Sequence, residues 1–110
     1  MEELVKGNVV VVPWTFSDLT EAKRRPALVI ASLTGEDVIL CQITSQKILD
    51  RYAITLLSSD FQEGGLNQTS NIRPNRLFTA DRRIILYKAG QIKSEKLNEV
   101  IVKIVEIIQS

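Results

Sequence analysis

Three basic residues stand side by side directly before a proline and an apolar segment: Lys23, Arg24 and Arg25. The residues before them include two aromatic side chains and one carboxylate: Trp14, Phe16 and Asp18. Aromatic faces stack with unpaired nucleobases, and Arg and Lys pair with phosphates, so this combination is typical of a site for single-stranded nucleic acid. The alternative interpretation is that the three cations are simply solvated at the entrance to a strand.

A second polar group follows the apolar segment 37–43 and consists of Thr44, Ser45 and Gln46. A turn at 33–36 joins this segment to the strand predicted at 27–32, so the two strands form a hairpin. The start of the first strand and the end of the second then lie at the same end of the sheet, and we expect Arg25 close to Thr44. A guanidinium beside a hydroxyl can cradle one phosphate group. Alternatively, the hydroxyls only satisfy backbone amides of the turn.

A third group begins at a second Arg-Pro pair, Arg73-Pro74, and continues with Asn75, Arg76, Thr79 and Asp81. Taken by itself this segment carries little information. Arg82 and Arg83, which follow it, are predicted to form a solvated turn.

Composition limits the classes of function. The 110 residues carry a formal net charge of +1, so a polyanion must be held by a local cluster of cations. Histidine is absent and Cys41 is the single cysteine, which excludes an internal disulfide, Ser-His-Asp or Cys-His catalysis and most zinc sites. Cys41 is predicted to be a buried structural thiol, and we expect no metal and no cofactor. We expect neither a signal peptide nor a membrane span, and place the protein in the cytosol.

Short β-branched or alternating segments predict five to seven strands in one domain, residues 1–110. The predicted strands are 8–14, 27–32, 37–43 and 53–57. Segments 70–73 and 76–79 make one or two more strands, and 84–88 is either a strand or a short turn. Residues 15–25 show no apolar period and are predicted to be a loop. Many short strands at tight intervals indicate a small, strongly curved sheet or barrel.

The last segment, 94–108, changes to a helical period. Its polar residues recur every three or four positions and its apolar residues fill the opposite face. Ser94 is predicted to cap the helix, and Glu99 and Lys103 to form an i,i+4 pair. The fold class expected is therefore mainly β with a C-terminal α-helix.

Four motifs in this order resemble the MazF/PemK toxins, which are sequence-specific endoribonucleases of toxin–antitoxin pairs. They are G-N-V-V-V-V, F-S-D-L-T-E-A-K-R-R-P-A-L-V-I, Q-I-T-S-Q and I-R-P-N-R-L-F-T-A-D. The similarity runs from about Gly7 through the terminal helix. It implies an SH3-like β-barrel with a terminal helix, a homodimer, single-stranded RNA as substrate and a cognate antitoxin as partner.

The resemblance also implies roles for individual residues. Arg25 matches the catalytic arginine, Thr44 the catalytic threonine, and Arg73 an arginine that some members use as a general acid. Asn75 stands where those members carry an aspartate proposed as general base, and an amide cannot take that proton. Phe78 replaces a frequent arginine before T-x-D, and the histidine that some members have in the first loop is missing.

These residues fit metal-free cleavage of RNA by its own 2′-hydroxyl. We assign Arg25 and Arg73 to charge stabilisation and Thr44 to orienting the phosphate, with Asp18 as first and Glu21 as second candidate for the base. Substrate contacts are predicted for Trp14, Phe16, Lys23, Arg24, Ser45, Gln46, Asn75, Arg76 and Thr79. Two alternatives stay open: a catalytically inactive nucleic-acid-binding module on the same fold, and a protein-interaction barrel.

Overall fold

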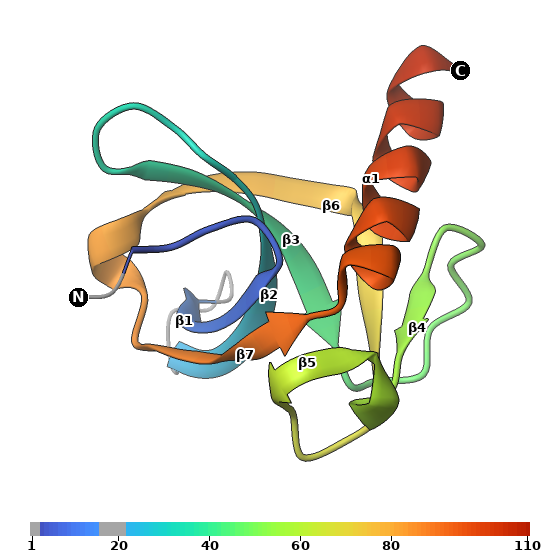
Figure 1. Ribbon diagram of the computed structural model, residues 1–110, viewed down its shortest axis with the longest axis horizontal. Coiled ribbons are helices and arrows are strands. Elements are labelled where there is room, and N and C mark those ends of the chain that lie inside the picture. Colours follow the sequence, from blue (N-terminus) through green and yellow to red (C-terminus); the bar gives the residue numbers. More distant parts are fainter. Residues whose placement is uncertain (1–2, 16–21) are drawn as a thin grey trace.

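The computed structural model describes residues 3–15 and 22–110, with the side chains of 3–13 and 23–110 (Figure 1). Seven strands form one antiparallel sheet in the order β4-β6-β3-β2-β1-β7-β5. The elements are β1 (Asn8–Thr15), β2 (Ala22–Ser32), β3 (Asp37–Thr44), β4 (Ile54–Leu56), β5 (Phe61–Gly64), β6 (Ser70–Asp81), β7 (Tyr87–Ile92) and α1 (Ser94–Gln109). Short 3₁₀ turns at Ser58–Asp60 and Arg82–Ile84 connect some of them.

The sheet curls into a half-barrel because its long strands are interrupted by bulges (Figure 1). The register shifts between β2 and β3 at Val29/Ala31 and between β3 and β6 at Cys41/Ile43. A bulge bends its strand and increases the local twist. The prediction of a mainly β fold, with a strongly curved sheet and a C-terminal helix, is confirmed.

Each face of the sheet has its own apolar core. One core lies under α1 and includes Val9, Leu28, Cys41, Ile43, Ile54, Leu56, Ile72, Val100 and Ile104. The opposite face buries Leu4, Val10, Val12, Ala27, Val29, Val38, Leu40 and Ile85. The run Val9–Val12 is buried at every position: Val9 enters the core under α1, and Val10 and Val12 enter the opposite core.

The predicted loop at 15–25 is wrong from residue 22 onward. β2 begins at Ala22, and Lys23, Arg24 and Arg25 pair with Trp14, Pro13 and Val12 of β1. The three cations therefore belong to a strand rather than to the loop before it. Backbone pairing with β1 outweighs the lack of an apolar period in this segment.

Two other strand predictions change. β5 was not predicted, and β7 covers 87–92 rather than 84–88. The segments 70–73 and 76–79, predicted as one or two strands, form one strand, β6, in which residues 73–76 stand opposite the single residue Gln42. Pro74 is accommodated in this bulge because a proline cannot donate a hydrogen bond to a regular ladder.

The terminal helix is confirmed, but its predicted details are wrong. Lys93 is the N-cap residue and makes no side-chain capping bond, while the Ser94 hydroxyl donates to Glu95 Oε1 at 3.1 Å. Instead of Glu99–Lys103, the ion pairs are the i,i+3 pairs Lys96–Glu99 at 3.2 Å and Lys103–Glu106 at 3.3 Å. The i,i+3 spacing also brings side chains together on a helix surface.

Candidate functional site

Arg25 of β2 and Thr44 of β3 lie on neighbouring strands, two residues past the end of the ladder between them. The pairing of β2 with β3 matches Ala27 with Gln42 and Leu28 with Cys41. Continued two residues beyond the end of this ladder, the same register would set Arg25 across from Thr44. Opposite residues of an antiparallel pair have Cβ atoms about 4.5–5.5 Å apart. The proximity of Arg25 and Thr44 stays a prediction, which the continued register supports.

The same register row continues across two more strands. Thr44 pairs with Asn71 of β6, and Asn71 pairs in turn with Thr55 of β4. Alternation along each strand puts all four side chains on the face away from α1, because neighbours such as Ile43, Ile54 and Ile72 enter the core beneath the helix. We call these four residues, Thr55, Asn71, Thr44 and Arg25, the polar row.

Thr44 is buried, with 8% of its surface exposed, and its Oγ1 accepts a hydrogen bond from the Gln46 amide at 3.1 Å. One lone pair of the Thr44 hydroxyl therefore satisfies a turn amide, as the alternative interpretation of the sequence predicts. That bond does not use the O–H donor of Thr44, which suits a group that donates to a phosphate oxygen.

Arg73 lies two residues beyond Asn71, and its guanidinium is held by Asp50. The Nη2–Oδ2 and Nε–Oδ2 distances are 3.2 and 3.4 Å, and the side chains of Arg73 and Asp50 are 19% and 11% exposed. The Tyr52 amide also donates to Asp50 Oδ1 at 2.9 Å. Sequence reasoning missed Asp50, because it comes from the connection between β3 and β4, 23 residues away from Arg73.

Hydrogen bonds keep Asp50 ionised. The Tyr52 amide, followed by Arg73 and the Asn75 side chain, holds the pKa of Asp50 below its usual value, against the effect of burial. A carboxylate with a lowered pKa is a weak base, and these groups already occupy its oxygens. Asp50 is therefore suited to fix Arg73 rather than to accept a proton from substrate.

The backbone of Arg73 is also fixed, by Cys41. The Cys41 thiol donates to the Arg73 carbonyl oxygen at 2.9 Å. Burial raises the pKa of this thiol to about 12, so it stays protonated and unreactive. The prediction of a buried structural cysteine is confirmed.

The remaining predicted site residues are dispersed. Phe16, Asp18 and Glu21 lie outside the described residues, and only the backbone of Trp14 is described. Lys23 and Arg24 are exposed and precede Arg25 on β2, whereas Ser45 and Gln46 are exposed directly after Thr44.

The predicted residues of β6 fall into two groups. Asn75 and Arg76 are exposed in the bulge. Thr79 pairs with Ile39, five residues along β3 from Thr44, or about 17 Å at the usual rise per residue. The structure therefore does not bring Thr79 to the polar row.

The solvated turn predicted after β6 is half right. Arg83 is 74% exposed and pairs with Asp81 at 2.7 Å, and its amide also donates to Asp81. The Arg82 side chain is only 23% exposed and lies 3.8 Å from Glu36.

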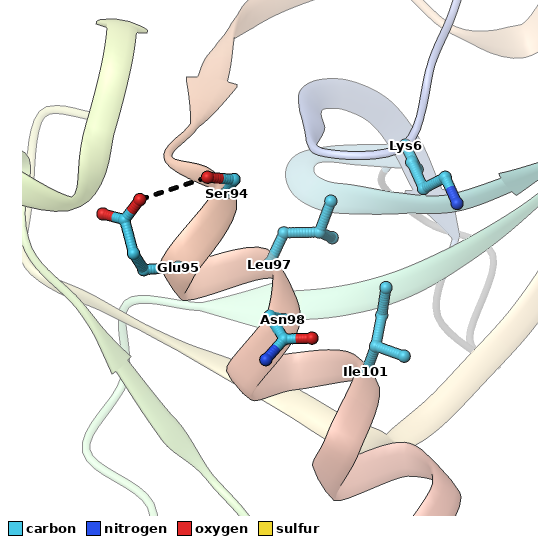
Figure 2. Close-up of a pocket in the computed structure, with 6 residues that line it drawn as sticks. All are labelled: Lys6, Ser94, Glu95, Leu97, Asn98 and Ile101. Carbon is cyan, nitrogen blue, oxygen red and sulfur yellow. Dashed lines mark hydrogen bonds between the residues drawn. The ribbon is translucent and has the colours of Figure 1, made fainter.

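A separate hollow of about 620 Å³ lies between α1 and the N-terminal segment (Figure 2). Leu97 and Ile101 project from the helix toward the segment that carries Lys6, and the hollow is also lined by Ser94, Glu95 and Asn98. None of the predicted site residues whose side chains the structure describes lines it. Among the described residues, no group of three His, Cys, Asp or Glu side chains is placed to hold a metal ion, and no helix is long and apolar enough to cross a bilayer.

The fold of this chain is similar to that of several solved structures. MazF from Deinococcus radiodurans superposes with a TM-score of 0.77 at 20% identity, with all of both chains covered. A MazE–MazF complex from the same organism gives 0.76 at 20% identity, covering 96% of each chain. A mycobacterial endoribonuclease in complex with its cognate antitoxin gives 0.77 at 12% identity, covering 97% of this chain and 96% of that one.

At these identities the solved structures establish the fold alone. No curated protein sequence matches the chain. The family model of the PemK-like, MazF-like toxins of type II toxin–antitoxin systems matches residues 5–108, which is nearly the whole chain. With the half-barrel and its terminal helix, this match shows that the chain belongs to the PemK-like, MazF-like toxin family.

Proposed function

We propose that this toxin is an endoribonuclease that cleaves single-stranded RNA without a metal ion. The observation that carries the proposal is the pairing of β2 with β3 in a member of this toxin family, because its register, continued by two residues, sets Arg25 across from Thr44. The relative from mycobacteria bears the name endoribonuclease, which adds support.

The reaction begins with attack of a ribose 2′-oxygen on the adjacent phosphorus. The bond from phosphorus to the 5′-oxygen then breaks, which leaves a 2′,3′-cyclic phosphate and a 5′-hydroxyl. Negative charge builds up on the phosphoryl oxygens in the transition state, and preorganised donors aimed at that charge lower the barrier. Arg25 supplies two parallel N–H donors and Thr44 supplies one O–H donor to these oxygens.

Two protons must also move, one from the 2′-hydroxyl and one to the 5′-oxygen. An arginine has a pKa above ~12 and is a poor proton donor at neutral pH, so we assign Arg25 and Arg73 electrostatic roles. The proposed base is Asp18, with Glu21 second. Asp50 is not a candidate for the base, because its oxygens accept from Tyr52 and Arg73.

The active form is proposed to be a homodimer in the cytosol, controlled by an antitoxin. A small half-barrel buries a modest core, and a second copy is a common way to cover the remaining apolar surface. The antitoxin segment is proposed to be acidic and to contact Lys23, Arg24 and Arg25 in place of RNA. MazE–MazF complexes of the same fold support a protein partner.

Incubation of single-stranded RNA with purified protein in EDTA tests this function. We expect cut RNA with cyclic phosphate ends and a mass in light scattering of about two chains. A shifted but intact RNA band would favour the inactive binding module, which is suggested by two departures from the family pattern, Asn75 and Phe78. A protein that neither cuts nor binds RNA would favour the interaction barrel.

A further inference from the structure

Asn71 is a polar residue at the centre of the polar row that neither the sequence motifs nor the proposed mechanism uses. It lies on β6, which pairs with β3 on one side and with β4 on the other at this point. Its side chain is half-buried, and within the described part of the chain its carboxamide makes no hydrogen bond. A half-buried amide with unused donors and acceptors, next to a proposed catalytic hydroxyl, is suited to contact a ligand.

The position of Asn71 is rigid. The adjacent Ile72 is fully buried and pairs with Ile43 on one side and Ile54 on the other. Two residues further on, Arg73 is tied to Asp50 and Cys41. Side chains that discriminate between ligands work best on elements whose backbone is fixed in this way.

Asn71 also lies at a suitable distance from the proposed phosphate position. It is one strand from Thr44 and two strands from Arg25, which is about 5 and 10 Å at the usual strand spacing. A phosphate held between Arg25 and Thr44 is joined to its nucleobase through one sugar. The base therefore falls within reach of the Asn71 side chain when the RNA crosses the strands along the row.

We propose that the Asn71 carboxamide reads the edge of one nucleobase next to the scissile phosphate and sets the sequence preference at that position. This inference rests on the proposed endoribonuclease function. A carboxamide presents a donor and an acceptor side by side, as do the edges of unpaired bases in RNA. A neutral amide adds no charge for phosphate binding. It discriminates between bases because a wrong base leaves the polar atoms of the amide unpaired, which is strongly penalised.

Cleavage of a randomised RNA pool, followed by sequencing of the cut ends, tests the role of Asn71. Asn71→Ala is expected to lose about ten- to a hundred-fold discrimination at one position and to keep the preferences elsewhere. Asn71→Asp keeps the shape but replaces the donor with an acceptor, so it is expected to change which base is preferred there. Asn98→Ala, the same change at an exposed position of α1, is the control and should keep the wild-type pattern. Melting curves confirm that each variant is folded.

The outcomes separate this inference from the function on which it rests. If wild type and folded Asn71→Ala cut with the same preferences, or if Asn71→Ala slows all sequences equally, base reading by Asn71 is refuted. If the wild type does not cut RNA, the proposed function fails. Binding to short RNAs that differ at one base then measures the same preference directly. An unchanged preference in Asn71→Ala, or no binding by wild type, overturns the inference in that case.

Discussion

The site has two halves that are positioned by different kinds of contact. Arg25 and Thr44 are expected to be neighbours because β2 and β3 form a hairpin with a short turn. Arg73 is placed by a bulge opposite Gln42 and by a carboxylate 23 residues distant in the chain. The first half follows from local pairing, whereas the second depends on how distant segments pack together.

The two halves also differ in electrostatics. The charge of Arg73 is shared with Asp50 at 3.2 Å, which weakens its attraction for a phosphate. In return Asp50 fixes the direction of the guanidinium and joins the β3–β4 connection to β6. We therefore expect the Arg25 half to carry most of the catalysis and the Arg73 half to carry more of the stability.

The largest expected effect is that of Arg25→Ala on the chemical step. Loss of one preorganised donor typically costs about 10²–10³ in rate, with a much smaller effect on RNA affinity. Arg25→Lys should recover little, because an ammonium cannot reproduce the two parallel donors. Single-turnover cleavage at saturating RNA measures these rates.

Matched variants sharpen the result for Arg25. Thr44→Ala should be harmful and Thr44→Ser mild, because only the hydroxyl is required. Arg24→Ala should weaken RNA binding and its dependence on salt while the cleavage step stays near wild type. If folded Arg25→Ala cleaves like wild type and Arg24→Ala does not, the catalytic arginine has been chosen wrongly.

A smaller effect is expected when the Arg73–Asp50 pair is broken. Asp50→Ala leaves the Tyr52 amide and the Arg73 guanidinium without their acceptor, which should lower the free energy of unfolding by about 1–3 kcal/mol. Urea denaturation of Asp50→Ala, Arg73→Ala and the double variant gives the coupling between the two side chains. Strictly additive losses would show that the pair adds no stability of its own.

The same pair should make stability depend on acid. The folded pKa of Asp50 is below its ordinary value of 3.8, so the ionised carboxylate stabilises the folded state above that pH. This contribution is lost as pH falls below 3.8 toward the lower folded value. The stability of Asp50→Asn should therefore fall less steeply than that of wild type between pH 5 and pH 3 in urea titrations, about the range in which carboxylates titrate. Identical pH profiles would contradict this assignment.

The smallest effect is expected at the exposed pair Asp81–Arg83. Its ion pair is shorter, 2.7 Å, and hydrogen bonds from Arg83 lower the pKa of Asp81 to about 2. Arg83 is mostly solvated, however, so the pair gains little over hydration of the separate groups. Arg83→Ala should leave the melting temperature unchanged within error in calorimetry. A loss as large as that of Asp50→Ala would remove the distinction between the exposed and the half-buried pair.

The sequence by itself determined the elements that rest on local patterns. The helical period of 94–108 and the hairpin of 27–43 both appear in the structure, apart from small shifts of their ends. The hairpin in turn predicted that Arg25 and Thr44 are close, because register within a hairpin is fixed by its turn. The family motifs are also short segments of consecutive residues, and the family match agrees with them.

Only the tertiary structure decided the parts that depend on distant strands. The predicted start of β2 at residue 27 was wrong because residues 22–25 become a strand only when β1 lies beside them. Asp50 and Asn71 carry no local signal, since an isolated aspartate or asparagine is common in any loop or strand. They join the site through the β6 bulge, the β3–β6–β4 register and the β3–β4 connection. Such pairings link residues far apart in sequence, and a side chain's neighbours across a sheet are set by register rather than by the residues next to it in the chain.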